Sequence, residues 1–361
     1  MPHDSGHILV INPGSTSTKI GVYTRDSAEF VRTIQHTDEE LAQFHQLPVL
    51  DQKDYRAERI ADELQKAGYG LKEFAAVAGR GGLLPPLASG TYLVDDVMLE
   101  ELRLARRGEH AANLGAVLAQ LFAVQAGVNA YIVDPVSVDE WQDRARFSGS
   151  ALLPRICQCH VLNTKAAARR FAREQGRRYD AMRLIVVHMG SGNSVSAHLN
   201  GRMIDNNTGD DGPFGADRSG SLPMRPLIGI CFSGAYTQKQ LERQVFGQGG
   251  LASYLGTRDL IEVERRIDAG DTMAAAVLDA MVYQVAKEAG AMAVVLEGDV
   301  DAVILTGGMA YSKRIVSALT GYLRWIAPIT VYPGEDELRS LAEGVFRVLD
   351  GEEQPRTIAP Q

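Results

Sequence analysis

The sequence predicts an α/β protein made of two similar domains, each built on a mixed sheet. Three observations support this fold class. The 361 residues exceed what one ordinary hydrophobic core holds. Residues 8–23 (ILVINPGSTSTKIGVY) and 184–199 (LIVVHMGSGNSVSAHL) share a pattern of apolar strand, small polar turn and second strand. A second internal similarity relates residues 76–82 to residues 303–308, because both are apolar strands that end in two glycines.

The remaining elements follow from the apolar periodicity along the chain. Helical spacing of apolar residues predicts a helix over 96–127 that Gly127 ends, and a short buried strand follows it at 130–134. Three further helices are expected at 160–175, 271–293 and 338–349. The helix at 271–293 is apolar on nearly every side, which indicates a central helix or one at an interface. We therefore expect one domain over 1–149 plus the closing segment 338–361, and a second over 150–337.

Composition narrows the possible partners. The chain is 45% apolar and 23% charged, with a net charge of −8 and an isoelectric point near 5.6. This charge argues against nucleic acid or an anionic membrane as the main partner. No apolar run reaches about 18 residues, the N-terminus lacks a signal-peptide pattern, and three cysteines make no disulfide framework. We expect a cytoplasmic protein in which Cys157 and Cys159 are packing residues.

The turn of the first hairpin, NPGSTSTK at 12–19, has the composition of a phosphate-binding turn. Asn12, Ser15, Ser17 and Lys19 provide polar and cationic groups, and the glycine between them permits close approach of a ligand to the backbone. The spacing differs from that of a Walker loop. A plain polar hairpin remains the alternative interpretation.

The turn of the second hairpin, HMGSGNS at 188–194, gives a stronger signal. His188 ends an apolar strand and is followed by Gly190, Gly192 and Asn193, a poor environment for a histidine that only packs. A histidine hydrogen-bonded at a strand end is the alternative.

A third turn, LTGGMAYS at 305–312, places Gly307 and Gly308 where a strand meets a helix start. That arrangement suits a nucleotide lying close to the backbone. A tight turn without a ligand is the other interpretation.

Two arginines and one aspartate complete the candidate set. Arg80 lies in GRGG and Arg218 in GPFGADRSGSLP, and an arginine held in such a loop is typical of an anion clamp. Asp134 ends its strand before Pro135, where its carboxylate serves either a magnesium ion or a turn.

These groups favour one class of phosphoryl transfer over another. A kinase that acts on an alcohol needs a carboxylate base, whereas a carboxylate substrate, with a reference pKa of about 4.3, is already ionised at neutral pH. What it needs is positive charge against the repulsion between two anions. Arginine, histidine, lysine and Mg²⁺ would provide it, so the product expected is an acyl phosphate.

Taken together, the motifs NPGSTSTK, GRGG, VDPVSVDEW, HMGSGNS, GADRSGSLP and LTGGMAYS resemble those of the acetokinase family, and most closely its butyrate kinases. The family belongs to the acetate and sugar kinase, Hsp70 and actin superfamily. The resemblance covers about residues 7–349. It implies two duplicated ribonuclease H-like (actin-like ATPase) domains with a cleft between them. It also implies reversible, direct in-line transfer between ATP plus butyrate and ADP plus butyryl phosphate, with Mg²⁺. The nearly apolar helix at 271–293 indicates a homodimer or higher homo-oligomer.

The resemblance also implies roles for the candidate residues. Arg80 would hold the acyl carboxylate, His188 and Arg218 would stabilise the phosphoryl group, and Asp134 would shape the metal environment. The metal ligands would be Asn12 and either Asp336 or Glu337, which the motif leaves open. The remaining candidates would contact ATP or ADP: Asn12, Ser15, Ser17 and Lys19 on the phosphate side, and Gly190, Gly192, Asn193, Gly307 and Gly308 near the nucleotide.

The chain departs from the acetate kinase pattern after Arg80, where GGLLPPL follows, and we expect a roomier apolar pocket there. The alternatives within enzymes are an acetate, propionate or branched-chain fatty acid kinase. From another class, an Hsp70-like or actin-like ATPase uses the same superfold, but it needs no acyl site and so no pair of arginines.

Overall fold

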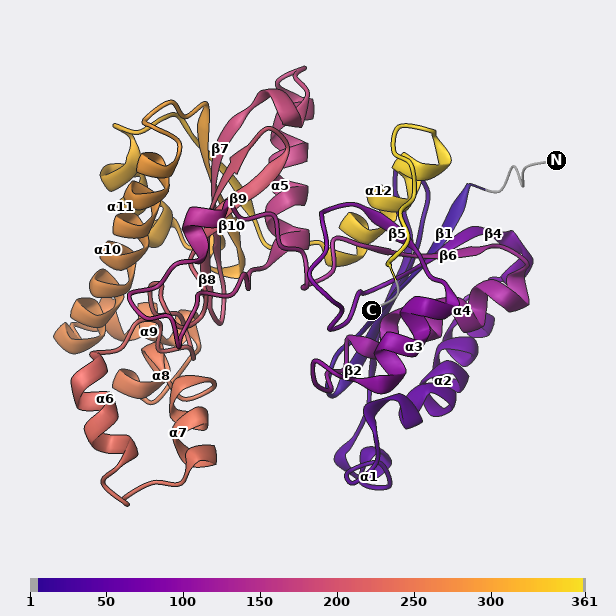
Figure 1. The fold of residues 1–361 in the computed structure, drawn as a ribbon, viewed down its shortest axis with the longest axis horizontal. Helices are drawn as coiled ribbons and strands as arrows, with labels where there is room; N and C mark the ends of the chain where they lie inside the picture. The colour runs from indigo at the N-terminus through magenta and orange to yellow at the C-terminus, as the bar shows by residue number, and fades with distance from the viewer. Residues whose placement is uncertain (1–5, 360–361) are drawn as a thin grey trace. The chain divides into compact units, whose positions relative to one another are not determined.

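The chain folds into two compact units, whose helices and strands Figure 1 follows along the sequence. The structure is a computed structural model, and it describes residues 6–359. One unit comprises residues 1–139 with 336–361, and the other comprises residues 140–335. The domain boundaries expected from the sequence, at 149/150 and 337/338, remain predictions.

The first unit contains a six-stranded mixed sheet in the order β3-β2-β1-β4-β6-β5. Strand β1 pairs antiparallel with β2 and parallel with β4, and β4 pairs parallel with β6. The parallel strands β1, β4 and β6 therefore end at the same edge of the sheet. The strands are β1 (His7–Pro13), β2 (Ser17–Tyr23), β3 (Ala28–Gln35), β4 (Phe74–Gly79), β5 (Thr91–Leu93) and β6 (Asn129–Val133).

Helices cover this sheet, and alternate strand residues point to each face. Leu9 and Ile11 of β1 belong to a core cluster with residues of α2 and α4, while α12 contacts β1, β2, β4, β5 and β6. The helices of this unit are α1 (Asp38–Ala42), α2 (Lys53–Lys66), α3 (Asp96–Leu104), α4 (Asn113–Ala126) and α12 (Glu337–Leu349).

The second unit contains a five-stranded sheet in the order β11-β10-β7-β8-β9. Its central strand β7 is buried over six of its seven residues, as expected for a strand covered on both faces. The strands are β7 (Arg183–Met189), β8 (Asn193–Leu199), β9 (Arg202–Asn206), β10 (Ala302–Gly307) and β11 (Ile329–Pro333).

The two sheets share one topology, which confirms the duplication predicted from the sequence. The order β3-β2-β1-β4-β6 of the first sheet matches β9-β8-β7-β10-β11 of the second, and each begins with an antiparallel hairpin followed by parallel strands. The hairpin strands and the glycine-ended strands that echo each other in sequence therefore occupy equivalent positions.

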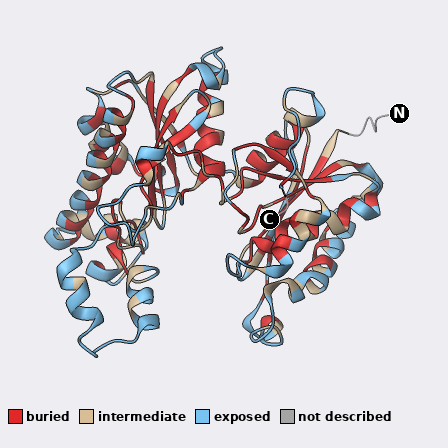
Figure 2. Ribbon diagram, in the orientation of Figure 1, coloured by how far each residue is buried: buried red, intermediate tan, exposed pale blue. Residues whose placement is uncertain are grey.

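The second unit has more helices than the first. The central one is α10 (Thr272–Val295), which packs on the sheet and on its neighbours α8, α9 and α11. Figure 2 shows the buried interior of this unit, and it shows α6 and α7 exposed. The remaining helices are α5 (Val161–Glu174), α6 (Met224–Cys231), α7 (Gln238–Val245), α8 (Gly250–Leu255), α9 (Leu260–Asp268) and α11 (Lys313–Leu323).

One predicted element was wrong. The helix expected over 96–127 is two helices, α3 and α4, separated by residues 105–112. Ala105 adopts a left-handed conformation (φ 44°) and ends α3, and Gly108 also has a positive φ. The expected end of the second helix is confirmed, because Gly127 caps α4 with φ 76°.

No helix within residues 6–359 has the length and apolar character that crossing a lipid bilayer requires. Cys159 is buried and Cys157 is partly buried, in agreement with packing roles.

Candidate active site

In each unit the candidate residues gather at the edge where the parallel strands end. In the first unit this edge carries Asn12 from β1, Arg80 after β4 and Asp134 after β6. In the second it carries His188 from β7, Gly307 from β10 and Glu335 after β11. Loops at the carboxyl ends of parallel strands are where α/β sheets bind ligands.

A carboxylate joins two of the predicted residues in the first unit. Glu337 begins α12, and its Oε2 accepts a hydrogen bond from Asn12 Nδ2 at 2.6 Å. Arg80 Nη1 lies 3.0 Å from Glu337 Oε1, and its side chain is only 16% exposed. Although close, this buried Nη1 group makes no well-aligned hydrogen bond to any described residue. Arg80 therefore keeps a buried donor for another acceptor.

The structure separates the two acidic candidates that the sequence left open. Asp336 caps the N-terminus of α12, where its Oδ1 accepts a hydrogen bond from the Arg339 amide at 2.9 Å. Glu337 is the residue that contacts Asn12 and Arg80.

Glycines hold Arg80 against its neighbours. A side chain at Gly82 would meet the Cα atom of Asn113 at 2.6 Å, and one at Gly115 would meet the Arg80 carbonyl oxygen at 2.1 Å. Leu83 N also donates to Asn113 Oδ1 at 2.9 Å. The glycines of GRGG thus permit a close approach between the loop after β4 and the start of α4.

Asp134 is fully buried, with φ at 39°. Its Oδ1 accepts hydrogen bonds from Ser89 Oγ at 2.5 Å and from the Gly90 amide at 2.9 Å. The aspartate therefore fixes the turn before β5. Its part in the metal environment stays a prediction.

In the second unit, His188 is paired with a histidine that the sequence analysis missed. His188 is 2% exposed, and its ring stacks on that of His160 with centroids 4.4 Å apart. His188 Nε2 lies 3.4 Å from Glu335 Oε2, and its buried Nδ1 makes no hydrogen bond to the described residues. The stack lies at the edge where β7 and β11 end, so His160 belongs to the candidate site.

Neighbouring polar groups orient this pair. His160 directly precedes α5, and its Nδ1 lies 2.9 Å from Ser194 Oγ on β8. Asn163, in the first turn of α5, donates to Glu335 Oε2 at 3.1 Å. The signal that was overlooked is a histidine at the first position of the helix predicted over 160–175, in CQCHVLN, which reaches the strand edge only after folding.

His188 is neutral at neutral pH. Burial, and then the proximity of His160, lower the pKa of His188 well below its ordinary value of 6.5. This shift disfavours the positive charge that the sequence analysis expected His188 to supply. The histidine can donate or accept a hydrogen bond instead.

Arg218 lies against the Gly-Ser-Gly turn of the second hairpin. Gly192 approaches it so closely that an added Cβ would meet Arg218 Cγ at 3.2 Å. The Asp217 amide donates to the Ser191 carbonyl at 3.1 Å, and Asn193 Nδ2 donates to the Phe214 carbonyl at 2.7 Å. These bonds fasten the arginine loop to the turn.

The Arg218 side chain is 42% exposed, and its Nε lies 3.3 Å from Asp217 Oδ1. Its guanidinium also lies over the Phe246 ring, 5.2 Å from the centroid. Arg218 is thus oriented by two neighbours while part of it remains open to a ligand.

The two remaining glycines differ in their surroundings. Gly307 has φ 89°, and a Cβ there would meet the Met189 carbonyl oxygen at 2.3 Å, so the fold itself requires glycine. A Cβ on Gly308 would meet nothing within 4 Å. Only Gly308 leaves open space that a nucleotide could use.

Solved structures define the class of fold. The acetate kinase of Porphyromonas gingivalis matches with a TM-score of 0.79 at 17% identity, over 95% of this chain and 100% of that one. A propionate kinase from Francisella tularensis subsp. tularensis SCHU S4 matches with a TM-score of 0.74 at 17% identity, over 94% of this chain and 98% of that one. The fold is that of the actin-like ATPase class to which these kinases belong.

Sequence relatives identify the family. The Acetokinase family matches residues 158–323. A protein of Listeria monocytogenes serotype 4a (strain HCC23), named "Probable butyrate kinase", is 48% identical over 351 residues, covering 97% of this chain and 98% of its own. A "Probable butyrate kinase" of Clostridium botulinum (strain Alaska E43 / Type E3) is 45% identical over the same length and coverage. The chain belongs to the acetokinase family, whose members are carboxylate kinases that use ATP, and it is therefore a phosphotransferase.

Proposed function

We propose that the protein phosphorylates a short-chain fatty acid, butyrate, with ATP, and that it runs the reaction in both directions. The observation that carries this proposal is the identity of 48% to a protein named "Probable butyrate kinase" over 97% of the chain. A match of this length spans both units and both sheets.

The first unit has the groups that a carboxylate substrate requires. Butyrate, with a pKa close to the reference value of about 4.3, is ionised at neutral pH and needs no base. Arg80 has a buried donor without a well-aligned partner, and an arginine fork matches a carboxylate. Arg80 therefore binds the acid, and it offsets part of the repulsion between butyrate and ATP.

The oxygen donors beside Arg80 fit a magnesium ion. Within residues 6–359 no group of three or more histidine, cysteine, aspartate or glutamate side chains could hold a metal by themselves. Mg²⁺ instead binds one or two protein oxygens together with phosphate oxygens and water. Glu337 and the side-chain oxygen of Asn12 supply those protein ligands. When bound, the ion neutralises charge on the nucleotide phosphates.

The second unit supplies hydrogen bonds and charge for the phosphoryl group. His188 and His160 lie stacked at the strand edge, and Glu335 and Ser194 orient them. Because His188 is neutral, it acts as a hydrogen-bond donor and not as a cation. Arg218 carries the positive charge, which stabilises the three equatorial oxygens in the transition state. No covalent phosphoenzyme is required, and transfer is in line.

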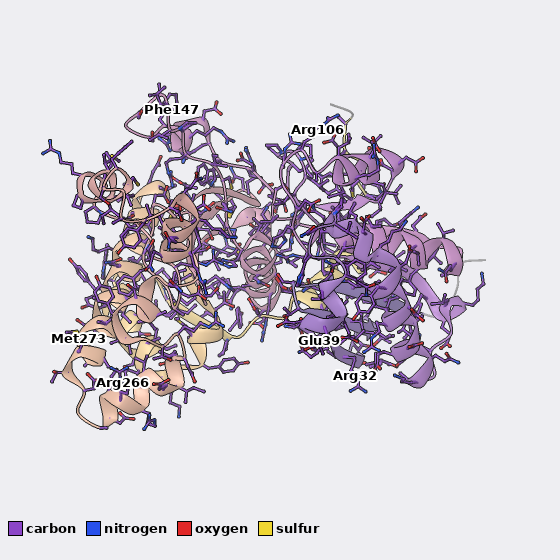
Figure 3. All side chains as sticks on the ribbon, turned by 90° about the horizontal axis from the view of Figure 1, so that it is seen from below. Arg32, Glu39, Arg106, Phe147, Arg266 and Met273 are labelled. Atoms are coloured by element: carbon purple, nitrogen blue, oxygen red, sulfur yellow. The ribbon has the colours of Figure 1, made fainter. Side chains whose placement is uncertain are left out.

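We also propose that two copies of the chain associate. One face of α10 is exposed and mostly apolar, and Figure 3 labels Met273 on it. Met273 is 59% exposed and Val294 is 77% exposed, and Trp325 near the end of α11 is 74% exposed. Exposed apolar side chains along a helix are candidates for an interface between copies. A homodimer or higher homo-oligomer would cover them.

A series of short acids tests the substrate assignment. Acyl phosphate formed from ATP, Mg²⁺ and acetate, propionate, butyrate or isobutyrate is trapped with hydroxylamine, and kcat/KM is compared. A buried methylene contributes up to about 0.8 kcal/mol, or about fourfold in kcat/KM. Butyrate has two more methylenes than acetate and should therefore exceed it by up to about fifteenfold.

Two outcomes distinguish the butyrate assignment from the broader assignment as a carboxylate kinase. Acetate as the best substrate would refute the butyrate assignment and retain the carboxylate kinase. No acyl phosphate from any acid, with ATP hydrolysis intact, would favour the alternative of an ATPase without an acyl site. Chelation of Mg²⁺ with EDTA should abolish turnover with every acid.

A further inference from the structure

Arg56 is a fully buried arginine on the first turn of α2. Among residues 6–359, no aspartate or glutamate lies within ion-pair distance of it. Burial lowers the pKa of this guanidinium to about 10, so it still carries its charge at neutral pH. A buried cation without a carboxylate is costly, and it persists where it is well hydrogen-bonded.

Its hydrogen bonds go to the turn that joins β1 to β2. Arg56 Nη1 donates to the carbonyls of Gly14 at 2.9 Å and Ser17 at 3.2 Å, and Nη2 donates to the carbonyl of Ser15 at 3.1 Å. Nη1 also donates to Thr18 Oγ1 at 2.9 Å. The guanidinium thus binds three carbonyls of one short turn.

These bonds determine which way the peptide groups point. In a trans peptide the carbonyl of one residue and the amide of the next point in opposite directions. With the carbonyls of Gly14 and Ser15 directed inward at Arg56, the amides of Ser15 and Thr16 point outward. Both residues are exposed, and neither amide donates to another group of the described chain. Free backbone amides of consecutive residues that point the same way are a typical binding site for an anion.

A neutral network keeps the guanidinium in place. Gln52 Oε1 accepts a hydrogen bond from Arg56 Nε at 2.9 Å. Thr18 Oγ1 lies 2.9 Å from His36 Nε2, and His36 Nδ1 lies 3.1 Å from the Tyr55 hydroxyl. Burial, and then the charge of Arg56, lower the pKa of His36 to about 4, so His36 itself adds no positive charge behind the turn at neutral pH.

We propose that Arg56 is a positioning residue for phosphate binding, because it orients the backbone of the turn at residues 14–18 so that its amides face the nucleotide. This role rests on the proposed function of the turn. Arg56 contacts no substrate itself. Its fixed charge behind the peptide groups also strengthens the positive potential that the amides present to an anion.

The test replaces Arg56 with lysine, which keeps the charge but has three donors on one atom and cannot reproduce the fork. In folded Arg56→Lys the KM for Mg-ATP should rise at least about tenfold, while the KM for butyrate stays within about twofold. Affinity for ADP, measured by calorimetry, should fall by a similar factor. If Arg56 only stabilises the fold, its replacement should lower the melting temperature without raising the KM for Mg-ATP more than the KM for butyrate.

Arg59→Gln is the matched control, because Arg59 is also on α2 and contacts Glu40 at 3.7 Å, and its side chain makes no hydrogen bond to the turn at residues 14–18. It should leave both KM values within about twofold of wild type. If Arg56→Lys does not fold, Gln52→Leu removes the acceptor that fixes Nε, and ADP affinity should fall at least about threefold. Wild-type ADP affinity in folded Arg56→Lys, or in Gln52→Leu where that variant is needed, overturns the proposal. The ADP measurement needs no acid substrate, so failure of the butyrate assignment is seen separately.

Discussion

Replacing Glu288 with glutamine should make the stability of the protein less dependent on pH. Glu288 lies on α10, and burial, together with the negative charge of Asp211, raises its pKa from 4.5 to about 7. Asp205 on β9 adds to this rise, while Arg155 and Lys287 oppose it. The carboxylate therefore changes its charge within the physiological range.

The surroundings of Glu288 include the start of the loop that carries Arg218. Arg155 Nε donates to Asp211 Oδ2 at 2.7 Å, and its Nη1 donates to Asp205 Oδ1 at 3.3 Å. Asp211 Oδ1 in turn accepts a hydrogen bond from the Thr208 amide at 2.6 Å. Above neutral pH, ionised Glu288 adds a third negative charge near Arg155, beside Asp205 and Asp211. It therefore weakens the contacts that hold the start of the Arg218 loop.

The magnitude follows from the change in pKa. A rise in pKa of about 2.5 units at about 1.4 kcal/mol each gives an upper limit of about 3.5 kcal/mol. Because the folded state holds the proton more tightly than the unfolded state, stability is highest below about pH 4.5 and falls as pH rises toward 7. Glutamine imitates the protonated form. The gain in unfolding free energy from Glu288→Gln should therefore grow by about 2 kcal/mol between pH 5 and pH 8.

Urea denaturation of both proteins at pH 5, 6, 7 and 8 measures this difference. Glu242→Gln makes the same chemical change at an exposed position on α7 and should have a small effect that does not vary with pH. A gain for Glu288→Gln that is equal at pH 5 and pH 8 would refute the reasoning, because it would mean that the carboxyl titrates alike in both states.

Two further predictions concern the site and the assembly. His188→Ala and His160→Ala should each lower kcat by roughly a hundredfold, about 2.7 kcal/mol, with a modest change in the KM for ATP. His160→Gln keeps a hydrogen-bond donor and should lose less activity. Near wild-type kcat in the folded alanine variants would refute the proposed role of the two histidines. Val294→Glu should shift the protein to a smaller species by chromatography with light scattering, because it places a charge on the exposed face of α10. An unchanged mass for Val294→Glu would place the contact between copies elsewhere.

Local pattern alone predicted the fold class and the duplication. Alternating apolar strands and glycine-containing turns are properties of neighbouring residues, so the hairpins at 8–23 and 184–199 follow from the order of residues within each segment. The same locality explains the error at residues 96–127. Apolar spacing continues across Arg106 and Gly108, but the left-handed backbone at Ala105 depends on how α3 and α4 pack.

The sequence by itself also indicated the candidate loops, because Arg80, His188 and Arg218 stand in glycine-rich turns. It did not determine their partners. Glu337 joins Arg80 from a helix near the other end of the chain, and His160 reaches His188 from the start of a different helix. Arg56 binds a turn about 40 residues earlier. Side-chain contacts of this kind, and the low pKa of His188 that burial produces, arise only when distant segments pack, so only the tertiary structure could decide them.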